Sequence, residues 1–301
     1  MNSAKSKKII DNIVHIMFLL IGIICASIIV IIVLFILIKG LKPFFTKYNG
    51  KSANIFEFLF GTNFIKDKYG ILGLVINTLF IVLISSTIAL PISVLTALFI
   101  TRIAPKKLSY IIQIVVELLS AIPSIIFGLY GMGFINPLIR DFANAIGVQT
   151  AGGVSTLSVI LVLTMMIIPT ITTLSITSMR AVKEDLVNAS LALGATKTQS
   201  NFKIVIGGAK SGILAALILG VGRAIGEATA VSMVCGGANG ISIGLFSPTG
   251  TLTQAMMQGI YESTGIDYDI RFSVGIVLIV LIFISNLILN KVKKWICKYD
   301  A

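Results

Sequence analysis

Charged residues, and the side chains most used in catalysis, are scarce in this 301-residue sequence. Lys, Arg, Asp and Glu together make up 12% of the chain, whereas soluble domains contain about 25%. His15 is the single histidine, so a histidine-based metal centre and a Ser-His-Asp hydrolase site are excluded. The cysteines Cys25, Cys235 and Cys297 have neither metal-ligand spacing nor the pattern of a disulfide framework. The sequence therefore argues against an enzyme.

Apolar side chains, by contrast, are abundant. Hydrophobic residues account for 56% of the chain and its mean hydropathy is +1.01, which indicates an integral membrane protein. The net charge is +12, but the sequence has no basic stripe with interleaved aromatic residues, as a nucleic-acid-binding surface would have. The basic residues lie in short stretches between apolar runs, so membrane lipid, and not nucleic acid, is their expected counterpart.

Six apolar stretches are long enough to cross a bilayer, which takes about 20 residues. An even number places both ends of the chain on one side, and the loops on that side contain more Lys and Arg residues than the others. By the positive-inside rule, both termini are predicted to be cytoplasmic in a bacterial cell membrane. The expected fold class is an all-α integral membrane protein with six transmembrane helices, at residues 13–38, 72–100, 111–135, 154–174, 212–234 and 272–289.

These stretches divide the chain into three parts. Residues 1–70 are predicted to form an N-terminal cytoplasmic tail, the first transmembrane helix and an external interfacial segment. Residues 71–290 form a core of five spans, with a large cytoplasmic loop at about 180–210. Residues 291–301 form a basic cytoplasmic tail.

The fifth span contains two charged residues, Arg223 and Glu227, in the run GVGRAIGEATAVSMV. Their spacing of four predicts that they share one helix face. Each charge costs about 2.5 to 3.5 kcal/mol at the centre of a span, so both should face a protein interior or a water-filled path. Two interpretations stay open: a self-neutralising pair that fixes helix packing, or an Arg223 cation on a route for an anion, positioned by Glu227.

The third span contains Glu117 and then Pro123-Ser124. Glu117 is a candidate partner for Arg223. Pro123 should bend or interrupt the span and so free backbone groups, which is tolerated only where protein or a cavity satisfies them. Ser124 then offers a hydroxyl to a path, although a proline kink packed by small residues fits the sequence equally well.

The cytoplasmic loop is predicted to form a helix-turn-helix. Apolar residues recur at helical spacing over 182–193, a glycine interrupts them, and a second helical stretch runs on through residue 202. Such an element can dock in a groove of a soluble partner, whereas the alternative is a solvated connector between spans. The candidate docking residues are Ala189, Leu193, Gly194, Ala195 and Thr196.

This loop resembles the cytoplasmic EAA loop of bacterial ABC importer permeases, with Ala189, Gly194, Ala195 and residues 205–206 at matching places. It departs from that pattern where Gly207-Gly208 replaces the usual proline. Two membrane segments, ELLSAIPSIIFGLYG and RAIGEATAVSMVCGG, resemble those of the inner-membrane permeases of the phosphate-specific ABC importer, and look more like PstC than PstA. The resemblance runs from about residue 56 to the end of the sixth span.

The resemblance implies a MetI-like permease core over residues 71–290 and a subunit that imports inorganic phosphate. It further implies a heterodimer with a PstA-like permease, a dimer of PstB-like ATPases that binds ATP and magnesium, and a PstS-like extracytoplasmic phosphate-binding protein. This chain has no GxxxxGK[ST] loop, so it is expected to bind no cofactor itself, and ATP hydrolysis would occur on another polypeptide. Arg223, Glu227, Glu117 and Ser124 are then substrate-pathway candidates.

The sequence leaves three other functional hypotheses open. A permease of the same fold could import another oxyanion, such as sulfate, molybdate or phosphonate. A stand-alone carrier or channel would need no ATPase, but it should show internal repeats, and none is evident. A membrane scaffold or sensor would leave the cost of Arg223 and Glu227 unexplained.

Overall fold

The computed structural model describes residues 2–48, 52–65 and 67–298, and the side chains from residue 11 onward. The last three residues of the predicted basic tail, 299–301, lie outside the described part. Within that part, five helical segments are long and apolar enough to cross a membrane, and a bent pair of helices makes a sixth if it is counted as one span. The predicted all-helical, six-span architecture is confirmed, with one span bent sharply.

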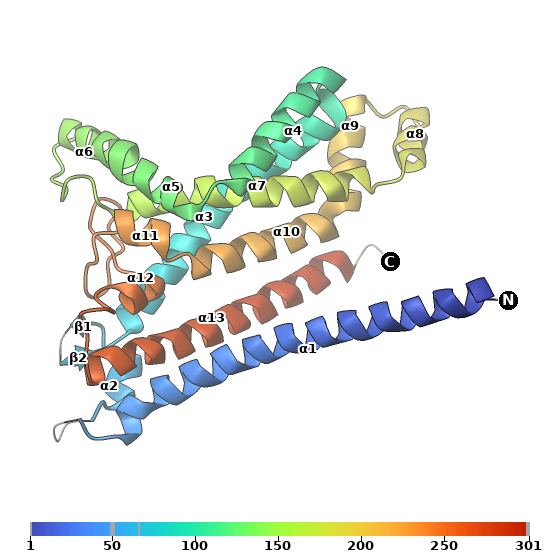
Figure 1. Ribbon diagram of the computed structural model, residues 1–301. Coiled ribbons are helices and arrows are strands. Elements are labelled where there is room, and N and C mark those ends of the chain that lie inside the picture. The colour runs from blue at the N-terminus through green and yellow to red at the C-terminus, as the bar shows by residue number, and fades with distance from the viewer. Residues whose placement is uncertain (1, 49–51, 66, 299–301) are drawn as a thin grey trace.

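The long helices are α1 (Asn2–Phe45), α3 (Leu72–Leu98), α7 (Thr156–Arg180), α10 (Ile206–Gly226) and α13 (Ile266–Cys297). The bent pair consists of α4 (Lys106–Ala121) followed by α5 (Ser124–Tyr130) and α6 (Asn136–Ala145). The beginning of α1 and the end of α13 lie at the same end of the molecule as α8 (Glu184–Ala192) and α9 (Lys197–Ser200) (Figure 1). The opposite end carries α2 (Ile55–Phe60) and a short antiparallel pair, β1 (Phe64–Ile65) and β2 (Lys68–Tyr69).

Helices α3 and α7 pack closely at the centre of the molecule. Ser85 Oγ donates to the Ile160 carbonyl and Ser93 Oγ donates to the Ile168 carbonyl, each over 3.2 Å. The two serines are eight residues apart on α3, and the two carbonyls are eight residues apart on α7 in the same order. The two helices therefore run parallel. Small hydroxyl side chains suit such a contact because they allow close backbone approach and add hydrogen bonds between helices.

The loop that joins α11 (Thr229–Val234) to α12 (Leu252–Met257) is held by one buried amide from α3. Asn77 Nδ2 donates to the carbonyls of Gly240 and Gly250, at 2.9 and 3.1 Å, and Asn77 Oδ1 accepts from Ser242 N at 2.9 Å. The side chain of Asn77 is fully buried. All its functional atoms are thus used, which stabilises an irregular loop that has few backbone hydrogen bonds of its own.

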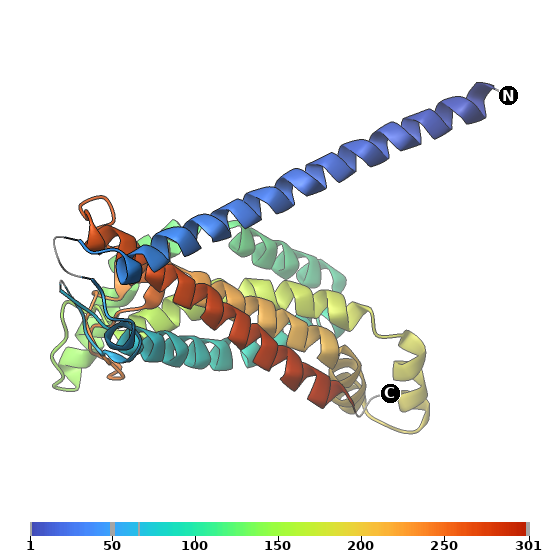
Figure 2. The same cartoon turned by 90° about the horizontal axis from the view of Figure 1, so that it is seen from below.

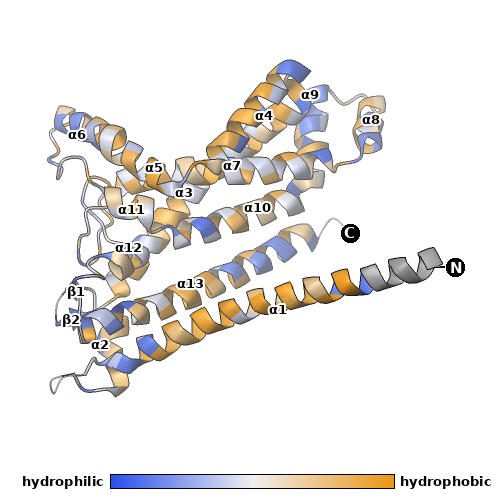
Figure 3. Cartoon of the chain, in the orientation of Figure 1, coloured by the Kyte–Doolittle hydropathy of each residue, from blue (hydrophilic) through white to orange (hydrophobic). Residues whose placement is uncertain are grey.

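Among the described side chains of α1, those that are not exposed all lie in its C-terminal part. Residues 11–32 are all exposed, and α1 diverges from α13 toward its N-terminus (Figure 2). That exposed stretch is strongly apolar (Figure 3), as a lipid-facing or subunit-facing helix must be. Closer to its end, Gly40 admits the α13 backbone, because a Cβ there would lie 2.7 Å from the Phe272 carbonyl. Ser273 Oγ donates to the Gly40 carbonyl over 2.6 Å.

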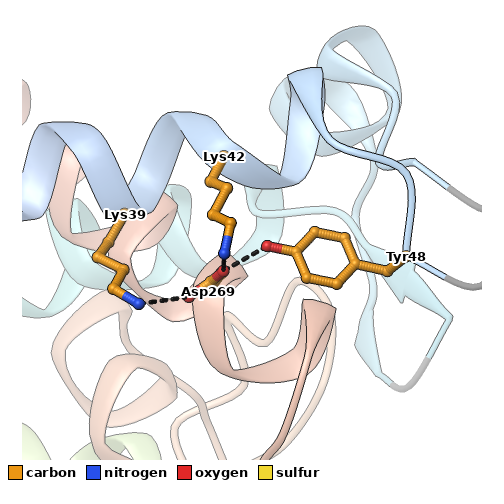
Figure 4. Close-up of polar contacts among 4 residues, drawn as sticks. All are labelled: Lys39, Lys42, Tyr48 and Asp269. Carbon is orange, nitrogen blue, oxygen red and sulfur yellow. Dashed lines mark hydrogen bonds and ion pairs between the residues drawn. The ribbon is translucent and has the colours of Figure 1, made fainter.

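A cluster of charges fastens this end of α1 to the start of α13 (Figure 4). Asp269, only 4% exposed, lies 3.8 Å from Lys39 Nζ and 3.6 Å from Lys42 Nζ, and accepts a hydrogen bond from the Tyr48 hydroxyl. Burial, together with the Asp269 carboxylate, raises the pKa of Tyr48 to about 12, which favours the protonated hydroxyl that donates to Asp269. A buried carboxylate is stabilised only when it is paired in this way.

We expect the substitution Asp269→Asn to destabilise the protein by about 1–3 kcal/mol, because it removes the charge on which Lys39, Lys42 and Tyr48 converge. Both lysines are partly exposed and can turn to water, which limits the cost. Thermal unfolding in detergent measures the effect. The exposed Glu262→Gln provides a matched charge change, and equal melting temperatures for the two variants would contradict the role of the cluster.

Candidate functional site

The fifth span does not continue through its charged motif. Helix α10 ends at Gly226, Glu227 has an extended conformation (φ −73°, ψ 118°), and α11 begins at Thr229. The prediction that Arg223 and Glu227 share one helix face is therefore wrong. A glycine followed by a side chain that can bond to the backbone favours such a break.

The break is stabilised by contacts of Glu227 itself. Its Oε1 accepts from Ala230 N at 3.0 Å, as a cap does at a helix start. Its carbonyl, which α10 leaves without an intrahelical partner, accepts from Thr253 Oγ1 at 2.8 Å. Glu227 thus shapes the backbone between α10 and α11.

Arg223 has a neutral partner. Its Nη1 donates to Thr170 Oγ1 on α7 over 2.9 Å, and its side chain is half-buried. A guanidinium held by a hydroxyl keeps its positive charge and its remaining donors for another ligand. The interpretation of a self-neutralising pair with Glu227 is not supported by these contacts.

Arg223 borders a cavity of about 610 Å³ between α7, α10 and α13. The cavity is open to the molecular surface, since Leu219 on its lining is 56% exposed. This volume lies within the range of about 300–1,000 Å³ that is usual for ligand sites. The cavity is lined by Thr170, Ala215, Ile218, Leu219, Gly222, Arg223, Asn286 and Asn290. A small anion could therefore reach the guanidinium without displacing helix-packing contacts.

Glu117 lies on α4 in a different polar chain. Gln113 Nε2 donates to Glu117 Oε1 at 2.8 Å, and Arg180 Nη2 donates to Gln113 Oε1 at 2.7 Å. The bond from Arg180 ties α4 to the end of α7, along which α4 packs. The structure thus joins Glu117 to Gln113 and Arg180, and the suggested pairing of Glu117 with Arg223 is wrong.

The predicted interruption at Pro123 is confirmed. Helix α4 ends at Ala121, residues 122 and 123 are extended, and the direction changes by 95° between α4 and the following helices. Ser124, half-buried, is the first residue of α5. Its hydroxyl therefore lies directly at the bend.

The helices that follow the two breaks pack against each other. A Cβ on Gly128 of α5 would lie 2.6 Å from Met233 Sδ and 3.0 Å from Ala230 Cα. After α5 the chain forms the π-helix η2 (Gly131–Ile135), and a Cβ on Gly131 would lie 2.6 Å from Val234 Cγ1. Glycines in the third span thus let the bent segment approach α11, close to Glu227.

The loop between α7 and α10 forms the predicted helix-turn-helix. Helix α8 ends at Ala192, Gly194 has φ +86°, and Thr196 caps α9. Thr196 Oγ1 accepts from Gln199 N at 3.2 Å, and Gln199 Oε1 accepts from Thr196 N at 2.9 Å, which is a capping box. Leu193 is 90% exposed at the turn.

The remaining docking candidates support this turn. Ala189 O accepts from Leu193 N, and Ala195 N donates to Ser190 O, both over 3.1 Å. The structure therefore brings Ala189, Leu193, Gly194, Ala195 and Thr196 together in one compact element. A large apolar side chain at an exposed turn is a feature of interaction surfaces.

Sequence reasoning missed four residues that shape the site: Thr170, Thr253, Asn286 and Asn290. The two threonines carry no signal of their own, since hydroxyl residues are common in spans. Asn286, inside the apolar sixth span, did carry one, because polar side chains at membrane depth are costly and often functional. Asn290 lies one residue past that predicted span.

Residues 89–297 match the family model of the binding-protein-dependent transport system inner membrane component. The chain is 34% identical over 267 residues to the probable ABC transporter permease protein YqgH of Bacillus subtilis, covering 87% of this chain and 84% of that protein. It is 28% identical over 270 residues to the phosphate transport system permease protein PstC of Pasteurella multocida, covering 83% and 84%. It is 32% identical over 235 residues to PstC of Xylella fastidiosa, covering 73% and 72%.

Two solved transporters share the fold. A chain of a bacterial alginate ABC transporter, in complex with a periplasmic protein, superposes with a TM-score of 0.66 at 18% identity, covering 93% of this chain and 96% of that one. A chain of the inward-facing MetNI methionine ABC transporter gives a TM-score of 0.61 at 18% identity, covering 75% and 95%. The predicted MetI-like permease fold is thereby confirmed.

The membrane spans, the fold and the similar proteins all point to the same family. This multi-pass inner-membrane protein is a permease subunit of an ABC importer and not an enzyme, and it belongs to the family of binding-protein-dependent transport system inner membrane components.

Proposed function

We propose that this chain forms half of the translocation pathway of an ATP-driven importer of inorganic phosphate. The observation that carries the proposal is Arg223, whose charge at membrane depth is held by the neutral Thr170 hydroxyl and faces a cavity. A planar guanidinium suits the oxygens of a tetrahedral anion. The relatives named as PstC phosphate permeases favour phosphate over other oxyanions.

In this proposal the other half of the pathway is a PstA-like permease, and a PstS-like protein delivers phosphate from outside. ATP and magnesium are bound by a PstB-like ATPase dimer, and this chain binds no cofactor. Both termini and the α8–α9 element face the cytoplasm, and that element docks on the ATPase. Glu227 contributes by shaping the break between α10 and α11, and Ser124 places its hydroxyl at the bend after Pro123. Glu117 accepts a hydrogen bond from Gln113, the residue that joins α4 to Arg180 of α7.

Coupling between docking and transport has a simple physical basis in this chain. Residues 197–226 form one continuous helical segment, from α9 through the π-helix η3 (Asn201–Val205) and α10. At 1.5 Å per residue, Arg223 lies about 40 Å along this rod from Lys197. A rigid-body movement imposed on the helix-turn-helix is therefore carried to the guanidinium.

A second candidate function is import of a different oxyanion by the same mechanism. YqgH, among the relatives, is named only as a probable ABC transporter permease. A guanidinium alone does not distinguish phosphate from sulfate, since it only donates hydrogen bonds.

We expect Arg223→Ala to reduce phosphate uptake by about tenfold or more, since a charge-assisted hydrogen bond contributes about 1.5–3 kcal/mol. Uptake is measured in proteoliposomes that contain the whole transporter and its binding protein, and copurification of the ATPase checks assembly. Arg140→Ala, which removes an exposed arginine paired with Asp141, should leave uptake unchanged. Normal uptake by Arg223→Ala would refute the role of the arginine in the path.

We expect Gly194→Val to weaken ATPase copurification and ATP-driven uptake together. A β-branched residue at φ +86° is strained by about 1–3 kcal/mol, so the turn that presents Leu193 would change shape. Gly147→Val is the matched control, because Gly147 has φ +77° and, like Gly194, has open space around it. Equal behaviour of the two variants would remove the docking role of α8–α9.

A further inference from the structure

The cavity beside Arg223 has polar groups on two sides. Arg223 and Thr170 lie on one side, from α10 and α7, and Asn286 and Asn290 lie on the other, from α13. The asparagines are four residues apart and therefore share one face of their helix. The other lining residues are alanine, isoleucine, leucine and glycine, so these four side chains supply the polar side-chain groups of an otherwise apolar lining.

The asparagines have a chemistry that Arg223 lacks. A guanidinium only donates hydrogen bonds, whereas a carboxamide both donates and accepts. Inorganic phosphate retains at least one proton at neutral pH, so it offers an O–H donor as well as acceptor oxygens. Amides can satisfy both without adding charge, which keeps the anion bound weakly enough to leave the site again.

We propose that Asn286 and Asn290 are substrate-binding residues that, with Arg223 and Thr170, form a site for a small protonated oxyanion between α10 and α13. This inference rests on the proposed function, because it assigns further ligands to the same path. It makes α13 part of the translocation site, in addition to its contact with α1.

The test measures phosphate binding directly at the cavity. Leu219→Cys places a thiol on the lining, in a protein whose three native cysteines are replaced by alanine, and the whole transporter is labelled with a maleimide. Inorganic phosphate should slow labelling. In Asn286→Leu/Asn290→Leu, the half-protecting phosphate concentration should rise about tenfold, as expected for lost hydrogen bonds to a charged ligand. Leucine is close to asparagine in size and is compatible with a span.

Two further variants separate ligand binding from structure. Asn286→Asp adds a negative charge, so it should weaken phosphate protection more than Asn286→Leu does, whereas a purely structural polar role predicts the reverse order. Asn144→Leu, at an exposed position on α6, should leave protection unchanged. Copurification of the ATPase shows that each variant is assembled.

The outcomes distinguish this inference from the proposed function. Unchanged half-protection in the double leucine variant, with protection lost in Arg223→Ala, would overturn the role of the asparagines and leave the anion path intact. If neither phosphate nor sulfate protects the Leu219→Cys thiol in the protein with native asparagines, both this inference and the proposed function would be overturned. Protection by sulfate at concentrations where phosphate has no effect would overturn the assignment to a protonated oxyanion.

Discussion

Every polar group freed inside a membrane must find a partner within the protein. In this chain that constraint governs the two places where a span is interrupted, at Pro123 and at Gly226. Glu227 satisfies the second break, with its carboxylate on Ala230 N and its carbonyl on Thr253. Because Glu227 is used in this way, Arg223 is left with a neutral hydroxyl partner and an open cavity.

Contacts elsewhere in the fold connect the helices around that cavity to both ends of the molecule. Hydroxyl contacts fix α3 to α7, and α10 continues directly into the α9 end of the helix-turn-helix. At the opposite end, Asp269 and Asn77 hold α1 and the irregular loop. Arg223 therefore lies on a rigid element between two surfaces, as transport driven by external and internal partners requires.

Local signals in the sequence predicted the spans, the bend at Pro123 and the turn at Gly194, because apolar length, proline and glycine act over a few residues. They did not predict the end of α10, since Gly226-Glu227 is compatible with a helix and the residue that satisfies the break, Thr253, lies 26 positions further on. The partner of Glu117 was missed for a similar reason: the polar chain depends on Arg180, brought close by the packing of α4 on α7. Cavities such as that between α10 and α13 depend on contacts across the whole fold.

The most direct test of the account is ATP hydrolysis by the assembly that copurifies with this chain in lipid. The ATPase rate is measured in the presence of phosphate-loaded binding protein and in the presence of phosphate-free binding protein. Sulfate and molybdate in place of phosphate serve as controls. The account predicts stimulation by the phosphate-loaded form alone, because only a delivered anion that fits the Arg223 site completes the cycle. Stimulation by another oxyanion with no response to phosphate would contradict it.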